Sequence, residues 1–193
     1  GEFEKTDKTA ITSSVPRGMV CDEEGRVLVD NKANNAISYA KSVDTLSSDI
    51  YKTANRLSQW VSVDTGSLTR RDKADYYLAN AKNLKKVEAS LPKSKTHKAN
   101  GDAIDSDALY KLELAAVKSS ALHLTSQQKS AAAMFKIMSG AYQLSTVYVK
   151  NSGMSEKEVA EVSEHLTELP GINVTDDWSR SYPNGSSVAS IIG

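Results

Sequence analysis

The fold class follows from one stretch toward the end of the chain, Tyr142-Gln143-Leu144-Ser145-Thr146-Val147-Tyr148-Val149-Lys150. Its residues alternate between two faces, and such a period of two is typical of a β-strand. The segment Ser155-Glu156-Lys157-Glu158 that follows has the spacing of a capping box, which begins a helix. Residues 172–175 then return to the alternating pattern. The sequence therefore predicts a strand, a helix and a second strand over residues 142–175.

Helical patterns fill the middle of the chain. Asp44 is the expected N-cap of a first helix, whose apolar stripe comprises Leu46, Ile50, Ala54, Leu57 and Val61. Further helices are predicted to begin at Thr69 to Asp72, at Asp105 or Ser106, and at Thr125. Residues 90–101 contain Pro92 and the turn pair Asn100-Gly101, and are predicted to be a basic, polar loop.

Two short motifs flank these elements. The first runs from Arg17 to Leu28, where two apolar runs surround Asp22-Glu23-Glu24-Gly25-Arg26 and predict a hairpin. The second runs from Arg180 to Gly185 and ends a strand at Pro183-Asn184-Gly185. We expect Arg17 and Arg180 to be partly buried and to bind carboxylates or carbonyls that join the two ends of the chain. The alternative for each motif is an ordinary solvated turn.

In this order the motifs resemble those of the N-terminal pedestal, or dimerisation, region of a class B penicillin-binding protein. The residues that match the pedestal motifs are Arg17, Gly18, Asp22, Gly25, Leu28, Arg180, Tyr182, Pro183 and Gly185. Residues 68–79, Leu-Thr-Arg-Arg-Asp-Lys-Ala-Asp-Tyr-Tyr-Leu-Ala, look like the 2b type from Gram-positive bacteria. We expect these motif residues to be structural, because no nucleophile stands beside them.

An α+β fold is expected, with a β-rich pedestal lobe built from both ends of the chain. Residues 18–43 and 140–193 are predicted to form this lobe, and residues 44–139 a helical insertion, or head subdomain. Residues 1–17 are expected to be an N-terminal tail. Part of that tail, Gly1-Glu2-Phe3, resembles a cloning scar.

A transpeptidase would need Ser-x-x-Lys together with Ser-x-Asn and Lys-Thr-Gly. The first pattern occurs at Ser38, Ser90 and Ser126, but the sequence contains neither of the other two. Ser126 is better explained as part of the capping box that Thr125 begins. We therefore expect no catalytic residue and no enzymatic activity in this chain, although the parent protein resembles a peptidoglycan D,D-transpeptidase.

Composition restricts the other classes of function. The chain has 24 basic and 24 acidic side chains, so its formal net charge is 0 and it offers no field for nucleic acid. Cys21 is the single cysteine and is expected to be a small buried hydrophobe. The three histidines of the chain lack the spacing of a metal site, so we expect no metal and no cofactor. No apolar run reaches the roughly 20 residues that span a bilayer.

The resemblance implies a non-catalytic, extracellular role in peptidoglycan synthesis. Such a pedestal would position a D,D-transpeptidase domain and contact a membrane glycosyltransferase of the shape, elongation, division and sporulation family, with other cell-wall synthesis proteins. A homodimer is a further possibility. The parent would be anchored at the outer face of the cytoplasmic membrane by an N-terminal helix that this sequence lacks. The alternative is a secreted binding module for peptidoglycan or a protein ligand. Stacked aromatics would favour a glycan, but only 6% of the residues are aromatic.

Overall fold

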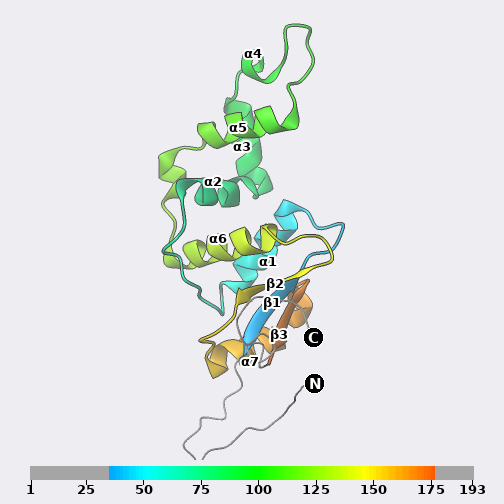
Figure 1. The fold of residues 1–193 in the computed structure, drawn as a ribbon. Coiled ribbons are helices and arrows are strands. Elements are labelled where there is room, and N and C mark those ends of the chain that lie inside the picture. Colours follow the sequence, from blue (N-terminus) through cyan, green and yellow to red (C-terminus); the bar gives the residue numbers. More distant parts are fainter. Residues whose placement is uncertain (1–34, 177–193) are drawn as a thin grey trace, which may run out of the picture. The chain divides into compact units, whose positions relative to one another are not determined.

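A computed structural model describes residues 35–176, which contain helices and a small sheet and so confirm the predicted α+β class (Figure 1). The strands are β1 (Ala36–Ala40), β2 (Thr146–Lys150) and β3 (Ile172–Thr175). The α-helices are α1 (Ser47–Leu57), α2 (Arg70–Leu78), α3 (Ala81–Ser90), α4 (Lys93–Thr96), α5 (Ser106–Ala116), α6 (Ser126–Ser139) and α7 (Glu156–Glu164). Two short 3₁₀ helices are η1 (Ser119–Leu122) and η2 (Leu166–Glu168).

The sheet places the earliest described strand at its centre, in the order β2-β1-β3. β1 is antiparallel to both neighbours, with Tyr39 opposite Val147 on β2 and opposite Ile172 on β3. Gly171 leads into β3 with φ +83°, and its carbonyl accepts a hydrogen bond of 2.9 Å from the Ala40 N–H. Chain segments more than a hundred residues apart therefore meet in one sheet.

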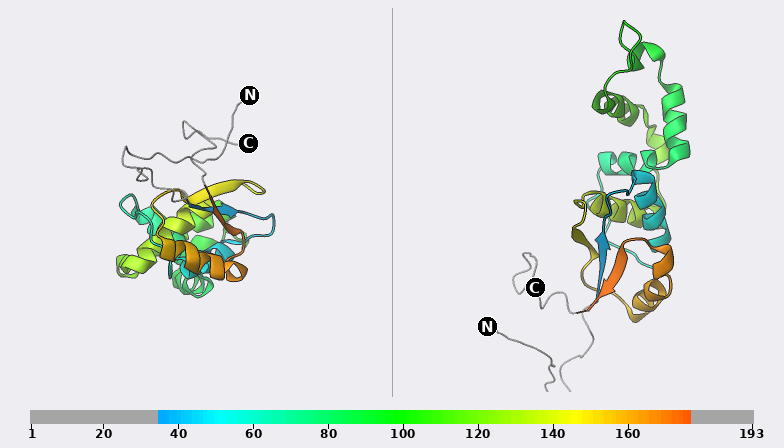
Figure 2. Two further views of the ribbon diagram at one scale, coloured as in Figure 1. Left: turned by 90° about the horizontal axis from the view of Figure 1, so that it is seen from below. Right: turned by 90° about the vertical axis from the view of Figure 1, so that its right-hand side faces the viewer.

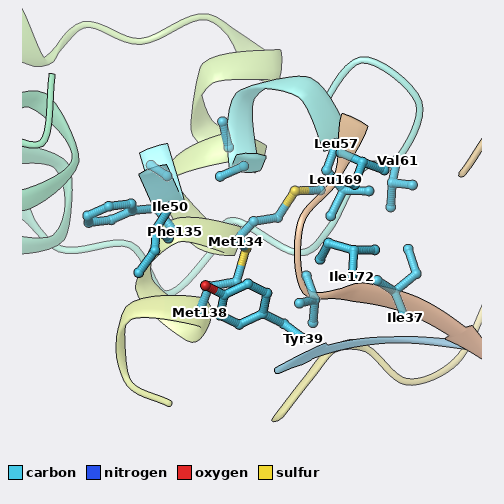
Figure 3. Packing of buried hydrophobic residues seen from close by; sticks show 14 of the residues in the cluster. Ile37, Tyr39, Ile50, Leu57, Val61, Met134, Phe135, Met138, Leu169 and Ile172 are labelled. Carbon is cyan, nitrogen blue, oxygen red and sulfur yellow. The ribbon is translucent and has the colours of Figure 1, made fainter. Parts of the chain in front are cut away.

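The main core lies between this sheet and helices α1 and α6 (Figure 3). Met134 and Met138 of α6 are fully buried, and Leu57 of α1 is buried with them. Ile37 and Tyr39 extend from β1 toward this cluster, two residues apart as the period of a strand requires. Figure 2 shows the same elements from two further directions.

A second, smaller core joins α2, α3, α5 and η1. Its buried members are Ala74, Leu78, Val87, Val117 and Leu122. Helix α2 also contacts α6, so it belongs to the surroundings of both cores. The predicted helical insertion therefore contributes to both cores. Helices α1 and α6 pack against the sheet, and α2, α3 and α5 surround the second core.

Four predicted helix starts are confirmed, and one is wrong. Ser155 is the N-cap of α7, with the predicted capping box to Glu158. Thr69, Asp105 and Thr125 are N-caps whose side chains accept backbone hydrogen bonds. Asp44 is not an N-cap, because α1 begins at Ser47 with Leu46 at the cap position. The Leu46 N–H donates instead to the carboxylate of Asp49, 2.9 Å away. The carboxylate that binds the N-terminal end of α1 is therefore Asp49, in the first turn, and not Asp44, before the helix.

Two further predictions need correction. The expected strand from Tyr142 begins only at Thr146, because residues before it form a turn in which Leu144 has φ +65°. The polar segment 90–101 is not a plain loop. It contains α4, and His97 beyond that helix forms an isolated antiparallel bridge with Ala103.

The division into a pedestal lobe (18–43 and 140–193), an insertion (44–139) and a tail (1–17) stays a prediction. Residues 1–34 and 177–193, on which much of it depends, lie outside the described range. Within that range, α1 and α6 of the predicted insertion share one core with all three strands. Among residues 35–176, no helix combines the length and the apolar composition that crossing a bilayer requires.

Candidate docking surface

The predicted motif residues cannot be placed. Arg17, Gly18, Asp22, Gly25, Leu28, Arg180, Tyr182, Pro183 and Gly185 all lie outside the described residues. Their structural role, and the burial expected of the two arginines, stay predictions.

The three Ser-x-x-Lys serines lie in unrelated surroundings. Ser38 is buried in the central strand β1 and only 5% exposed. Ser90 ends α3 and donates its hydroxyl to the Val87 carbonyl at 2.6 Å. Ser126 is the first residue of α6, directly after the Thr125 cap. The described residues thus give each serine a local structural explanation.

One end of the sheet carries the exposed large hydrophobic side chains of the described region. Val43 and Leu46 follow β1, and their exposed fractions are 56% and 64%. Tyr142 and Leu144 precede β2, and their exposed fractions are 84% and 83%. We call these four residues the apolar tip. Exposed apolar groups that gather in one place are typical of protein contact sites.

Hydrogen bonds fix the two loops of the apolar tip to each other. The Leu144 N–H donates to the Lys41 carbonyl at 2.9 Å, and the Gln143 amide donates to the Val43 carbonyl at 3.4 Å. Ser145 closes the second loop by donating its hydroxyl to the Tyr142 carbonyl at 2.7 Å. The apolar side chains are therefore presented by backbone that is already ordered.

Leu144 has an unusual backbone conformation. Its φ of +65° makes it the one described residue other than glycine with positive φ. A left-handed conformation costs an L-residue about 1–2 kcal/mol. Strain of this kind is commonly found at functional sites, where the surrounding structure holds it in place. Here the bond to Lys41 holds the strained residue while its side chain remains in solvent.

A polar cluster attaches β2 to α7 elsewhere on the molecule. Lys150 Nζ lies 3.1 Å from Glu158 Oε2 and 2.8 Å from the Ser62 carbonyl. Burial opposes ionisation of Glu158, but hydrogen bonds from the Ser155 N–H and from Lys150 outweigh it and hold its pKa below the usual range. This cluster is structural, because both charged side chains are largely covered.

One aromatic stack bears on the alternative of glycan binding. The rings of Trp60 and His165 lie 4.1 Å apart at an interplanar angle of 14°. Trp60 also packs against the main core, and the His165 ring nitrogen Nδ1 is 2.7 Å from the Glu161 carbonyl. Both rings thus have partners within the protein. Among residues 35–176, no group of three or more His, Cys, Asp or Glu side chains has the arrangement of a metal site.

Comparison with known protein families shows which family this chain belongs to. The family model described as the penicillin-binding protein dimerisation domain matches residues 12–193. The chain belongs to this family. The resemblance inferred from the two sequence motifs is therefore confirmed.

Relatives and solved structures agree with the family. The chain is 38% identical over 191 residues to penicillin-binding protein 2A of Bacillus subtilis, covering 98% of this chain and 26% of that protein. It is 30% identical over 186 residues to penicillin-binding protein 2B of Streptococcus pneumoniae, covering 96% of this chain and 27% of the relative. The structure of penicillin-binding protein 2B from strain R6 superposes with a TM-score of 0.56 at 28% identity, covering 83% of this chain and 24% of that one. The chain spans about a quarter of the length of these relatives.

Sequence reasoning missed the apolar tip. Leu46 falls in the predicted apolar stripe of the first helix, and Tyr142 and Leu144 fall in the predicted strand, where apolar residues are normally buried. Val43 belongs to none of these predicted patterns. The available signal was positional, since each of the four lies at the edge of a helical or strand pattern.

Proposed function

We propose that this dimerisation domain is the non-catalytic, extracellular pedestal of a class B penicillin-binding protein that acts in peptidoglycan synthesis. It positions a D,D-transpeptidase domain above the outer face of the cytoplasmic membrane, to which an N-terminal helix of the parent protein attaches it. The observation that carries this proposal is the family match over residues 12–193.

The second part of the proposal concerns the partner. The apolar tip docks a membrane glycosyltransferase of the shape, elongation, division and sporulation family. Its four side chains are exposed and apolar, and hydrogen bonds join the loop that holds Val43 to the loop that holds Leu144. Aromatic anchors such as Tyr142 often dominate the binding energy of protein interfaces.

The test is binding of the purified chain to the detergent-solubilised glycosyltransferase. A double variant, Tyr142→Ser with Leu144→Gly, removes the two most exposed apolar side chains. Glycine suits the φ of +65°, so the loop is expected to keep its conformation. We expect affinity to fall at least about tenfold, as for loss of an interface anchor. Lys82→Ala, an exposed change on α3, is the matched control and should bind like the unaltered chain.

Two outcomes would contradict parts of this proposal. Equal binding by the double variant and the control would remove the apolar tip from the interface. Binding of the chain to isolated peptidoglycan, lost when residues 90–101 are deleted, would favour the alternative of a wall-binding module.

Fluorescent penicillin should label the full-length parent and leave this chain unlabelled, since the partners of a nucleophilic serine are missing from its sequence.

A further inference from the structure

The chain turns back on itself in a hairpin at residues 96–104. The Ile104 N–H donates to the Thr96 carbonyl at 3.0 Å, and His97 pairs with Ala103 in an antiparallel bridge. The residues between these pairs are exposed. Side chains at the end of this hairpin therefore meet water, while hydrogen bonds hold its backbone in one conformation.

Asn100 and Gly101 lie in the turn at the end of the hairpin. Gly101 has φ +92°, and its N–H donates to the Lys98 carbonyl at 2.9 Å. No atom lies within 4 Å of the position that a Cβ at Gly101 would occupy. The backbone nitrogen of Gly101 thus has no side chain beside it and open space on that side, which lets another group approach closely.

The Asn100 side chain folds back over this backbone. Its Oδ1 accepts a hydrogen bond from the Asp102 N–H at 3.0 Å, and its Nδ2 donates to Asp102 Oδ2 at 3.1 Å. A bond from a side-chain oxygen to the N–H two residues further along curls the side chain over the intervening peptide bond. The carbon of the carboxamide, Cγ, therefore lies on the side of the Gly101 nitrogen. The Asp102 N–H also stabilises negative charge that develops on Oδ1.

We propose that Asn100 is a site of self-modification, at which the Gly101 nitrogen attacks the side-chain carboxamide. The nitrogen gives its proton to hydroxide and forms a bond to Asn100 Cγ, while an electron pair of the C=O bond moves to Oδ1. The pair returns as the Cγ–Nδ2 bond breaks, and Nδ2 takes a proton from water and leaves as ammonia. Water opens the resulting five-membered imide at either carbonyl, which gives aspartate or isoaspartate at residue 100. The reaction needs only water, and it is independent of the proposed pedestal function.

Two features of the hairpin set the rate of this reaction. Attack within one molecule is favoured, because the two reacting atoms are already held together. The hydrogen bond from the Gly101 N–H to the Lys98 carbonyl opposes the attack, since the nitrogen must first lose that proton. A short exposed turn opens at small cost, so we expect a rate within about tenfold of that in a free peptide of residues 96–104.

Asn80 is the internal control. Its side-chain oxygen also accepts a backbone hydrogen bond, from the Asn83 N–H at 3.0 Å, but it does so as the N-cap of α3. The next residue, Ala81, carries a Cβ and begins the helix. A nitrogen in the first turn of a helix, beside a methyl group, is harder to reach than that of a glycine. We therefore expect no reaction at Asn80.

The products change the hairpin. Isoaspartate puts an extra carbon into the main chain between residues 100 and 101, which shifts the Asp102 carbonyl away from the Lys98 N–H that now lies 2.6 Å from it. Either product also replaces a neutral amide by a carboxylate. The backbone amide NMR signals of Lys98 and Asp102 should therefore shift as product forms.

The test is ageing of the purified chain at neutral and at alkaline pH, followed by brief tryptic digestion at slightly acidic pH and mass spectrometry. Tryptic peptide 99–111 contains Asn100 as its single Asn, and peptide 74–82 contains Asn80 as its single Asn. We expect peptide 99–111 to gain the mass difference between an amide and an acid and to separate into two products, while peptide 74–82 keeps its mass. The reaction should be faster at alkaline pH, because the attacking nitrogen has to be deprotonated.

Variants connect the reaction to the named residues. Gly101→Ala puts a methyl group beside the attacking nitrogen and should slow the modification of Asn100 at least about tenfold. The added Cβ meets no other atom, and a melting curve checks that the variant folds. Asn100→Gln moves the carboxamide one methylene further away and should leave residue 100 unmodified.

Three results would overturn the proposal. If peptide 99–111 keeps its mass while the free peptide of residues 96–104 reacts, the fold protects Asn100. Equal reaction at Asn80 would mean that the hairpin gives no selectivity. An unchanged rate in Gly101→Ala would mean that the Gly101 nitrogen is not the attacking group.

Discussion

Replacement of Gly171 by alanine tests the account of how β3 joins the sheet. Gly171 has φ +83°, and a Cβ at this position would lie 2.5 Å from the Ala40 carbonyl oxygen and 2.9 Å from Cε1 of Tyr39. The left-handed backbone alone costs an L-residue about 1–2 kcal/mol. The contact with a backbone oxygen adds to this cost, because a main-chain atom of the central strand cannot move away as a flexible side chain can.

We expect Gly171→Ala to lower the free energy of unfolding by about 2–4 kcal/mol in all. For a chain of this size that corresponds to a fall in melting temperature of roughly 5–15 °C. Thermal unfolding followed by circular dichroism measures it.

Gly153→Ala is the matched control. Its φ is +73°, close to that of Gly171, but no atom lies within 4 Å of the added Cβ. The control therefore isolates the backbone strain, at about 1–2 kcal/mol. Equal melting temperatures for the two variants would refute the argument that close packing against β1 requires glycine at residue 171.

Three further changes test other parts of the structure. Thr125→Ala removes the side chain that caps α6 and should cost about 1 kcal/mol in urea unfolding, with Thr167→Ala at an exposed position in η2 as a neutral comparison. Met138→Ala leaves a cavity in the main core and should cost about 2–5 kcal/mol, and a smaller loss would mean that the core collapses around it. The pKa of Glu158 is lowered on folding, so its contribution is present above the unfolded pKa of about 4.3 and is lost as pH falls through the folded pKa. Glu158→Gln should therefore reduce stability at pH 7 and flatten its loss in acid, which unfolding curves between pH 7 and pH 2.5 would detect.

Local chemistry explains which parts of the fold were predictable. Thr69, Thr125 and Ser155 each stand three residues before an acidic or amide side chain, and each is an N-cap. Such signals act within one turn of a helix, so the sequence contains all of the interaction. The prediction for Asp44 was wrong, because α1 begins at Ser47 and the Leu46 N–H donates to the carboxylate of Asp49 inside the first turn. Residue type alone does not distinguish these two carboxylates.

Long-range packing explains what could not be predicted. The strands β2 and β3 were expected, but not that β1 would lie between them, because pairing depends on contacts far apart in the sequence. The apolar tip combines two loops whose residues Val43 and Gln143 are 100 positions apart in the chain. Their meeting is a property of the assembled sheet, and no periodicity or spacing reveals it.

The central place of β1 has a consequence for synthesis of the chain. Ala36 pairs with Thr175, and the two residues are 139 positions apart. At about 5–20 residues per second, a ribosome needs roughly 7–28 seconds between making the first of these residues and the second. Until β2 is made, β1 with the apolar Ile37 and Tyr39 lacks both neighbouring strands, and until β3 is made it still lacks one, while the helices between can already form. Slow pairing of distant strands is the stage at which a nascent chain is most exposed to aggregation. A cell that makes this domain therefore has to protect its earliest described strand until nearly the last described residue has been added.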